Sequence, residues 1–359
     1  MAKNLLDLQP ERILIRAANW IGDAVMTLPA VRTVRENFPQ ARIDLLAQPW
    51  VADVFSASPH LDGIVLYDKK GAHAGLSGMV RLARDLAGAR YDLAILLQNA
   101  FEAAFIARLA RIPAIAGYRR DARSLLLTHG VSCTRQRKQV HQVAYYHLLL
   151  DDLGLRLGPE RLDLPLSPEQ RDWARDFHAK HGAHRPVIGV NPGAAYGPAK
   201  RWPAERYGEV VAKALRKHPE AVVYVFGTTD DRNAATEIRN AASGHIIDLT
   251  GRTTLSQAIA LIALCDVFIT NDSGLMHVAA ALDRPLVAVF GSTNPVTTGP
   301  FSDKARVVRK AMECSPCYRT NCRRGFECMR AISPDEVARE VLAILDEKAS
   351  RDRQEFVAS

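Results

Sequence analysis

Three loops, each following a predicted strand, carry the residues of this chain whose types and spacing could do chemistry. The first is Asn19-Trp-Ile-Gly-Asp-Ala-Val-Met26, which comes after the apolar run 13–17. Gly22 lets a backbone or a ligand approach closely, and Asp23 falls at or just before the first helical turn. A carboxylate at this end of a parallel sheet faces the ligand-binding edge, so Asp23 can serve as a general base. Capping of the helix is an alternative role that is compatible with the first.

The second loop, Asn191-Pro-Gly-Ala-Ala-Tyr-Gly-Pro-Ala-Lys-Arg-Trp-Pro203, leaves a strand and enters a helix at Trp202. It carries Lys200 and Arg201, and a lysine ammonium is the compact positive charge that suits a phosphate. Loops at this edge of a sheet commonly contact phosphates. A surface loop with solvated charges is the alternative interpretation.

The third loop is Thr270-Asn-Asp-Ser-Gly-Leu-Met-His277, between a buried strand and a helix. Asp272 or Ser273 can cap the helix, and the free amides that begin at Gly274 would form an anion site. His277 falls in the first helical turn, where a histidine is more often structural than a ligand. The loop is therefore expected to bind an anionic group.

Several common catalytic motifs are absent from the sequence. It contains no GxxxxGK[ST], no GxGxxG and no GxSxG, which disfavours a P-loop ATPase, an NAD(P) dehydrogenase and an α/β-hydrolase. There is also no Asp-x-Asp, the carboxylate pair that commonly holds a divalent metal beside a nucleotide-sugar diphosphate. A bound diphosphate must then be neutralised by protein groups.

Short β-rich apolar runs alternate with longer helical patterns, which predicts parallel α/β architecture. Strands are expected at 13–17, 43–47, 63–67, 93–97 and 114–118, and again at 187–191, 222–227, 246–249, 267–270 and 286–291. Helices are expected at 24–37, 76–86, 102–111, 169–180, 204–217, 231–242, 255–265 and 275–282, and from Pro334 onward. A polar, proline-containing segment between the halves places the domain boundary near 180. The pattern predicts two Rossmann-like lobes that face each other across a cleft.

Length and composition agree with a two-domain globular protein. The chain has 359 residues, of which 48% are apolar and 24% are charged. No apolar run approaches the roughly 18–20 residues that span a bilayer. Charged residues break up any signal-peptide core in the first twenty positions, so we expect a cytoplasmic protein.

The net charge of +8 is unevenly distributed. Between Arg119 and Lys138 there are six Lys or Arg residues and one acid, Asp121. This stretch is either a platform for phosphate groups or a solvated face. The interleaved aromatic residues typical of single-strand nucleic-acid surfaces are missing from it, so no nucleic-acid partner is expected.

Four closely spaced cysteines form a C-x₂-C-x₄-C-x₅-C pattern at Cys314, Cys317, Cys322 and Cys328. Structural thiols without a metal are the favoured interpretation. Zinc or another metal centre is the second, because thiolates at such spacing can bind Zn²⁺, and disulfides are the third.

Together, the three loops resemble those of the heptosyltransferases of glycosyltransferase family 9, and the resemblance extends over about residues 12–345. Within that family, Asn19–Met26 is similar to the type II pattern. The resemblance implies a GT-B fold with an acceptor-binding domain at 1–180 and an ADP-sugar-binding domain at 181–359, whose last helix crosses back to the first. It also implies inverting transfer of L-glycero-D-manno-heptose from ADP-heptose onto the first heptose of the lipopolysaccharide inner core, with no cofactor required.

The resemblance also implies roles for individual residues. Asp23 is the expected base, and Lys200 is expected to contact the donor phosphates. The implied donor-side residues are Gly22, Lys200, Thr228, Asp230, Asp231, Thr253, Thr254, Asp272, Ser273, Gly274 and His277. The implied acceptor-side residues are Asn19, Trp20, Asn99, Arg119, Arg120 and His141. One position departs from the family: Glu102 stands where a basic residue is usual, which argues against a phosphate contact there.

The expected partners are an ADP-sugar, the lipopolysaccharide inner-core acceptor, and the anionic cytoplasmic face of the inner membrane, where the protein would be peripheral. Two alternatives from the same fold stay open: a transferase with another donor, such as a UDP- or GDP-sugar, and a type I acceptor preference. A third, from a different class, is a nucleotide-binding relative without catalysis.

Overall fold

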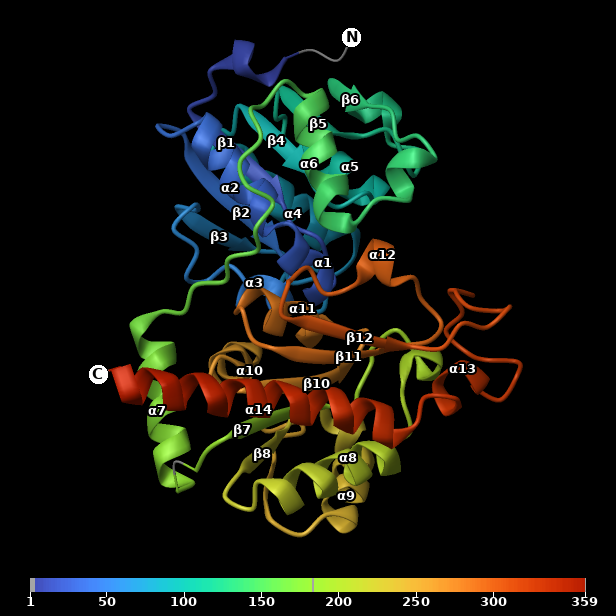
Figure 1. Ribbon diagram of the computed structural model, residues 1–359. Coiled ribbons are helices and arrows are strands. Elements are labelled where there is room, and N and C mark those ends of the chain that lie inside the picture. The colour runs from blue at the N-terminus through green and yellow to red at the C-terminus, as the bar shows by residue number, and fades with distance from the viewer. Residues whose placement is uncertain (1–3, 183, 359) are drawn as a thin grey trace. The chain divides into compact units, whose positions relative to one another are not determined.

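Two open parallel sheets, one in each half of the chain, organise the structure (Figure 1). It is a computed structural model that describes residues 4–182 and 184–358. The chain divides into two compact units between Pro165 and Leu166. The α/β class predicted from the alternation of strands and helices is confirmed. That the two lobes share a cleft, and that the last helix crosses to the first lobe, stay predictions.

The first unit contains a six-stranded sheet in the order β3-β2-β1-β4-β5-β6, with all neighbours parallel. Its strands are β1 (Arg12–Arg16), β2 (Arg42–Ala47), β3 (Gly63–Leu66), β4 (Leu93–Leu96), β5 (Ala114–Tyr118) and β6 (His129–Val131). The strand order switches direction between β1 and β4, the place where open parallel sheets bind ligands. The loop that carries Asp23 leaves β1 at this point.

Helices connect these parallel strands, as parallel pairing requires. They are α1 (Ile21–Met26), α2 (Leu28–Asn37), α3 (Pro49–Ala52), α4 (Gly75–Gly88), α5 (Phe101–Leu109) and α6 (Gln142–Asp152), with short 3₁₀ turns η1 (Leu5–Leu8), η2 (Ser124–Leu126) and η3 (Gln136–Lys138). The prediction of a single helix at 24–37 is wrong in one respect, since the chain forms two helices there, α1 and α2, with a break at Thr27. Pro29 explains the break, because it has no N–H to donate to the carbonyl of Val25.

The second unit repeats the arrangement, with a parallel sheet in the order β12-β11-β10-β7-β8-β9. Its strands are β7 (Val187–Asn191), β8 (Val222–Val225), β9 (His245–Asp248), β10 (Val267–Asn271), β11 (Leu286–Phe290) and β12 (Ala305–Arg309). The order switches between β7 and β10, and these two strands lead into the loops of Lys200 and Asp272. Both loops therefore leave the sheet at adjacent positions on its carboxyl edge.

The helices of the second unit are α7 (Pro168–Lys180), α8 (Ala204–Lys217), α9 (Arg232–Ala241), α10 (Leu255–Ile262), α11 (Gly274–Ala281), α12 (Pro295–Thr298), α13 (Glu327–Arg330) and α14 (Pro334–Ala358), with 3₁₀ turns η4 (Pro198–Lys200) and η5 (Thr229–Asp231). The sequence placed the domain boundary near 180, after α7. In the structure α7 packs against α10, and Gln170 Nε2 donates to Ser256 Oγ at 2.9 Å. These contacts place α7 in the second unit.

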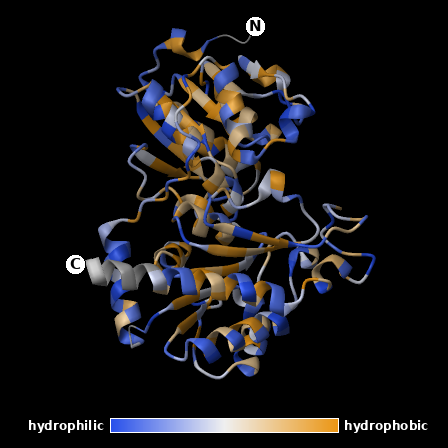
Figure 2. Cartoon of the chain, in the orientation of Figure 1, coloured by the Kyte–Doolittle hydropathy of each residue, from blue (hydrophilic) through white to orange (hydrophobic). Residues whose placement is uncertain are grey.

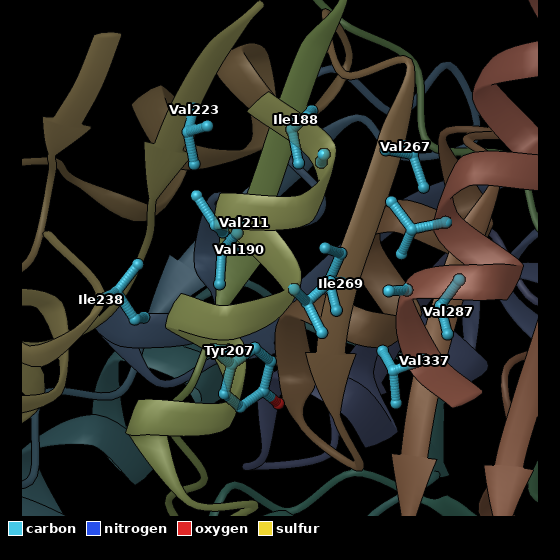
Figure 3. Close-up of a cluster of buried hydrophobic side chains, with 14 of the residues drawn as sticks. Ile188, Val190, Tyr207, Val211, Val223, Ile238, Val267, Ile269, Val287 and Val337 are labelled. Carbon is cyan, nitrogen blue, oxygen red and sulfur yellow. The ribbon is translucent and has the colours of Figure 1, made fainter. Parts of the chain in front are cut away.

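Hydrophobic residues gather on the strands of both sheets, and hydrophilic residues gather on the outer helices (Figure 2). In the second unit, the valine and isoleucine side chains of β7, β8, β10 and β11 pack under α8, α9 and α14 (Figure 3). Each such side chain stabilises the fold by about 1.5–3 kcal/mol when fully buried. This core holds the strand ends, and the loops that follow them, in fixed positions.

Two edge strands, β6 and β12, were not predicted. The sequence of β6 is His129-Gly-Val131, which is too short to give a pattern. The sequence of β12, Ala305-Arg-Val-Val-Arg309, has charged residues within it and is only half-buried. Edge strands tolerate such composition, because one side of the strand stays unpaired.

Within the described residues, no helix combines the length and the apolar character needed to cross a bilayer.

Candidate functional site

Asp23 is the third residue of α1, and its side chain is half-buried. The N-cap of this helix is Trp20, so the sequence-based alternative of Asp23 as the N-cap residue is wrong. The nearby Tyr146 hydroxyl is deeply buried; burial raises its pKa, and the charge of Asp23 raises it further. Asp23 therefore lies within electrostatic range of a neutral phenol that can donate a hydrogen bond.

The loop before Asp23 is held by Arg16, whose side chain is 1% exposed. Its guanidinium donates to Asn19 Oδ1 at 2.9 Å, and to the carbonyls of Ala17 and Leu46 at 2.7 and 3.1 Å. Burial lowers its pKa to about 10, so Arg16 stays charged at neutral pH. Trp50 Nε1 also donates to the Asn19 carbonyl, at 2.8 Å. Asn19 thus helps to shape the loop, and Arg16 is a site-forming residue that the sequence analysis missed.

Glu102, the position that departs from the family pattern, takes part in an ionic network. Lys69 Nζ lies 2.6 Å from Glu102 Oε2 and 5.6 Å from the centre of the Tyr67 ring. Burial raises the pKa of Tyr67, and its hydrogen bond to Glu102 adds to the shift. The Arg16 guanidinium lies over the same ring, 5.7 Å from its centre. Glu102 therefore anchors a lysine next to the loop of Asp23.

Among the acceptor-side candidates, Asn99 and Arg120 converge on one hydroxyl. Asn99 Nδ2 and Arg120 Nη1 lie 3.1 and 3.4 Å from Tyr145 Oη. Trp20 is exposed and lies at the start of α1. His141 differs from the others, because its Nδ1 accepts from Val143 N at 3.2 Å and caps α6. The structure thus brings Asn99 and Arg120 together, and it places the His141 ring where it caps α6.

The basic stretch 119–138 is only partly available as a platform. Arg123 is fully buried, donates to the carbonyl of Tyr118 at 2.9 Å, and has its pKa lowered by burial to about 10. Arg137 is paired with Asp152. Arg119, Arg135 and Lys138 are exposed. Of the six cations, three are therefore exposed and can meet an anionic surface, while Arg120 and Arg137 are half-buried and Arg123 is buried.

In the second unit, Lys200 and Asp272 form an ion pair. Lys200 Nζ lies 2.6 Å from Asp272 Oδ2, and the two side chains are 14% and 6% exposed. Thr293 Oγ1 donates to the same carboxylate oxygen at 2.5 Å. Removing one member of so buried a pair typically costs about 3–5 kcal/mol, because the other charge is left uncompensated. The pair therefore fixes the Lys200 loop against the end of β10.

Ser273 caps α11, and its hydroxyl belongs to a polar network. Met276 N donates to Ser273 Oγ at 3.3 Å, Asn191 Nδ2 donates to it at 2.8 Å, and Thr270 Oγ1 lies 3.0 Å away. Gly274 is the first residue of this helix, and His277 is buried in its first turn. Asp272 directly precedes the N-cap of α11, so its ion pair brings the Lys200 ammonium close to the N-terminus of this helix, an arrangement that suits an anionic ligand.

The other donor-side candidates lie in two turns. Asp231 is buried; its Oδ2 accepts from Thr228 N and Oγ1, both at 2.9 Å, and its Oδ1 lies 3.5 Å from Arg201. Thr254 caps α10 by accepting from Gln257 N at 3.2 Å. These three residues thus stabilise their turns.

The same two turns lie side by side, because Gly251 N donates to the Gly227 carbonyl at 2.9 Å. Asp230 is exposed and Thr253 is half-buried. Of the five candidates at these turns, Thr228, Asp230 and Thr254 are exposed, and these three are accessible to a ligand.

Asn271 was not singled out from the sequence, yet it clamps the Lys200 loop to β10. It is fully buried; its Oδ1 accepts from Trp202 N at 3.0 Å, and its Nδ2 donates to the Pro192 carbonyl at 2.7 Å. An asparagine at the end of an apolar strand was the signal that could have identified it, since a buried amide must find partners. Gln48, also fully buried, precedes α3 near the Asp23 loop.

The four clustered cysteines are free thiols. Among residues 4–182 and 184–358, no three His, Cys, Asp or Glu side chains are grouped so that they could hold a metal ion. Cys322 Sγ accepts from the backbone amides of Arg324 and Phe326, both at 3.3 Å. Burial raises the pKa of the Cys328 thiol.

The profile of glycosyltransferase family 9 (heptosyltransferase) matches residues 79–326. The lipopolysaccharide heptosyltransferase 2 of Salmonella typhimurium is 34% identical over 94% of this chain and 99% of its own. The solved structure of the E. coli ADP-heptose LPS heptosyltransferase II is 32% identical, covers 94% of this chain and 99% of that chain, and superposes with a TM-score of 0.80. A family 9 glycosyltransferase from Veillonella parvula is 26% identical over 94% of this chain and 98% of that one, with a TM-score of 0.83.

The buried clamp predicts a stability effect. Asn271→Ala leaves the Trp202 N–H and the Pro192 carbonyl without their partner, and each such loss typically costs about 1–3 kcal/mol. We expect a lower free energy of unfolding, by about 2 kcal/mol or more, measured by urea denaturation. Asn294→Ala is a control, because Asn294 caps the short α12 from a half-buried position and should cost about 1 kcal/mol. An equal loss in both variants would contradict the clamp.

Proposed function

This chain belongs to glycosyltransferase family 9, the heptosyltransferases, and we propose that it transfers L-glycero-D-manno-heptose from ADP-heptose onto the first heptose of the lipopolysaccharide inner core, with inversion. The family resemblance stated from the three loops is thereby confirmed, as is the assignment to the transferases. The chain acts in lipopolysaccharide heptosyl transfer, as its relatives of types 1 and 2 do. Its fold matches the two Rossmann-like units of a heptosyltransferase II structure.

The observation that carries the proposal is the pairing of Lys200 with Asp272 beside the capped N-terminus of α11. Lys200 and the amides after Ser273 would neutralise the donor diphosphate, and stabilise the charge that develops on the departing ADP. Because protein groups supply this charge, the reaction would require no metal ion or other cofactor.

In the first unit, Asp23 would act as the general base. It would take the proton from an acceptor hydroxyl while that oxygen attacks the anomeric carbon, and the C–O bond to ADP would break on the opposite face. The hydroxyl oxygen forms the new bond, the proton goes to the carboxylate, and ADP leaves with the bonding electrons. The half-buried carboxylate lies in the first turn after β1, where the strand order of the sheet switches, and this position supports the role.

Asn99 and Arg120 would bind the acceptor sugar, since both donate to the Tyr145 hydroxyl and so lie next to each other. The exposed Arg119, Arg135 and Lys138 would meet phosphates of the inner core or anionic lipid headgroups. The enzyme would then act as a peripheral protein at the cytoplasmic face of the inner membrane, where a lipid-anchored acceptor is held.

Replacement of the base tests the mechanism. Asp23→Asn should lower kcat by about 10²- to 10⁴-fold, the usual contribution of a general base, because the amide cannot accept the proton. ADP affinity should stay close to that of the unmodified protein. Asp85→Asn, which changes an exposed carboxylate in α4, should leave kcat unaltered. Near-normal turnover by Asp23→Asn, measured with ADP-heptose and a synthetic acceptor, would refute the assignment.

Replacement of Lys200 tests the donor site. Lys200→Ala should weaken ADP binding by about 10- to 100-fold, since it removes a charge-assisted contact to phosphate. Calorimetry in EDTA measures this without metal, well below the melting temperature of the variant, because loss of the Asp272 pair should also lower stability. Lys180→Ala, at an exposed position in α7, is the matched control.

The same titrations with UDP and GDP separate this proposal from a transferase with another donor. Unchanged ADP affinity in Lys200→Ala would count against the donor site. Tighter binding of UDP or GDP than of ADP would favour the other donor. Binding of ADP without any product from donor and acceptor would favour a non-catalytic nucleotide-binding protein.

The exposed cations predict a salt-dependent association with membranes. Neutralising Arg119, Arg135 and Lys138 together should weaken binding to vesicles of anionic lipid by about 100-fold at low salt, at about 1 kcal/mol per cation. The matched control neutralises three exposed cations elsewhere, namely Arg171, Lys180 and Arg216. Binding of the unmodified protein that does not change with salt, measured by flotation, would instead support a merely solvated face.

A further inference from the structure

An irregular segment between β12 and α13 contacts both loops that supply the partners of Asp272. We call residues 315–320 the strap. It begins after β12 and lies within the cysteine-containing stretch, and no helix or strand is formed between Arg309 and Glu327. Long irregular segments in compact domains commonly serve a functional role.

The strap is bonded first to the loop after β11. Cys317 N and Tyr318 N both donate to the Ser292 carbonyl, at 3.0 and 2.8 Å. Ser315 Oγ donates to the Gly291 carbonyl at 2.5 Å. The next residue along that loop is Thr293, whose hydroxyl donates to Asp272. The strap therefore holds Thr293, the hydrogen-bond donor to Asp272, in place.

The strap is bonded second to the loop of Lys200. Tyr196 Oη donates to the Tyr318 carbonyl at 2.7 Å, and Ala199 N donates to the Thr320 carbonyl at 3.0 Å. Gly197 has a φ of 143°, and a Cβ at this position would lie 2.7 Å from the Thr320 oxygen. Only glycine permits this close approach.

The Lys200 ammonium belongs to the same loop and lies 4.8 Å from the centre of the Tyr196 ring. An aromatic face attracts a cation at this distance. We propose that Tyr196 is a positioning residue of the transferase: the strap orients its ring, and the ring holds Lys200 Nζ where it can meet the donor diphosphate. The inference rests on the proposed donor role of Lys200.

The physical role of the ring is to limit the freedom of a long side chain. Lysine has four rotatable bonds, and ordering them costs free energy when a ligand binds. The Tyr196 ring and the Asp272 carboxylate together hold the ammonium before the donor arrives. Such preorganisation raises affinity without a contact between Tyr196 and the ligand.

A double-mutant cycle on ADP affinity tests the coupling of Tyr196 to Lys200. Tyr196→Leu removes the aromatic face, and it should weaken ADP binding by about 3- to 30-fold when Lys200 is present. In the Lys200→Met background the same change should alter ADP affinity by less than about twofold, because the ammonium that the ring holds is gone. Calorimetry measures all four proteins, and thermal unfolding checks that each is folded.

Tyr196→Phe keeps the ring and loses only the hydrogen bond to Tyr318. It should retain ADP affinity within about fivefold of the unmodified protein, because the aromatic face remains and only one neutral hydrogen bond is lost. This conservative variant keeps the test decisive if Tyr196→Leu folds poorly. A loss with Phe as large as the loss with Leu would overturn the role of the ring.

The outcomes separate this inference from the proposed function. If Tyr196→Leu weakens ADP binding equally in both backgrounds, the ring contacts the ligand itself, and the positioning role is wrong. If it weakens binding in neither background while Lys200→Met does, the donor site stands and the inference fails. If Lys200→Met alone leaves ADP affinity unchanged, the proposed donor role fails first.

Discussion

Parallel pairing of β7 with β10 is the constraint on which the donor-side geometry depends. The register places Thr270 opposite Asn191, so the loops after both strands leave the sheet together. Gly189 leaves room for the side chain of Phe268, its partner on β10, since a Cβ at this position would lie 2.5 Å from the Phe268 ring. A slip by one residue would turn the side chain of Asn191 to the other face of the sheet. Its bond to Ser273, the residue that caps α11, would then be lost.

Each unit stabilises its reactive loop with one buried polar side chain. In the first unit, Arg16 bonds to two carbonyls and to Asn19. In the second unit, Asn271 joins the amide of Trp202 to the carbonyl of Pro192. Burying such groups is costly unless their polar atoms find partners, and here the partners lie in the loops themselves apart from the Leu46 carbonyl of β2. The stability of the fold and the shape of the site are therefore linked through the same hydrogen bonds.

Much of the architecture could be predicted from the sequence, because the buried parallel strands are continuous apolar runs such as 187–191 and 267–270. The edge strands could not, since β6 is too short and β12 carries arginines. The three loops that resemble the family contained Asp23, Lys200 and Asp272. The sequence placed the last two on the donor side, but it did not predict that they form an ion pair.

Other features depend on contacts between distant segments, which no local pattern records. Thr293 meets Asp272 across 21 positions of the chain. Arg123 counts toward a basic stretch in the sequence, yet it is buried against backbone carbonyls and is no part of a surface. His141 is an acceptor-side candidate by position, and the sequence did not show that its ring nitrogen accepts from the first turn of α6. A local feature was missed as well. The apolar residues keep a helical period across Thr27, so the sequence pattern does not show the break between α1 and α2.

The strap holds its two neighbouring loops mainly through backbone amides and carbonyls, at Cys317, Tyr318 and Thr320. Such bonds do not depend on which side chains the strap carries. These bonds alone would let the side chains of the strap vary while its geometry persists, and a comparison of sequences would then undervalue it. The selective pressure should instead be visible on the receiving side, at Gly197, where a side chain has no room.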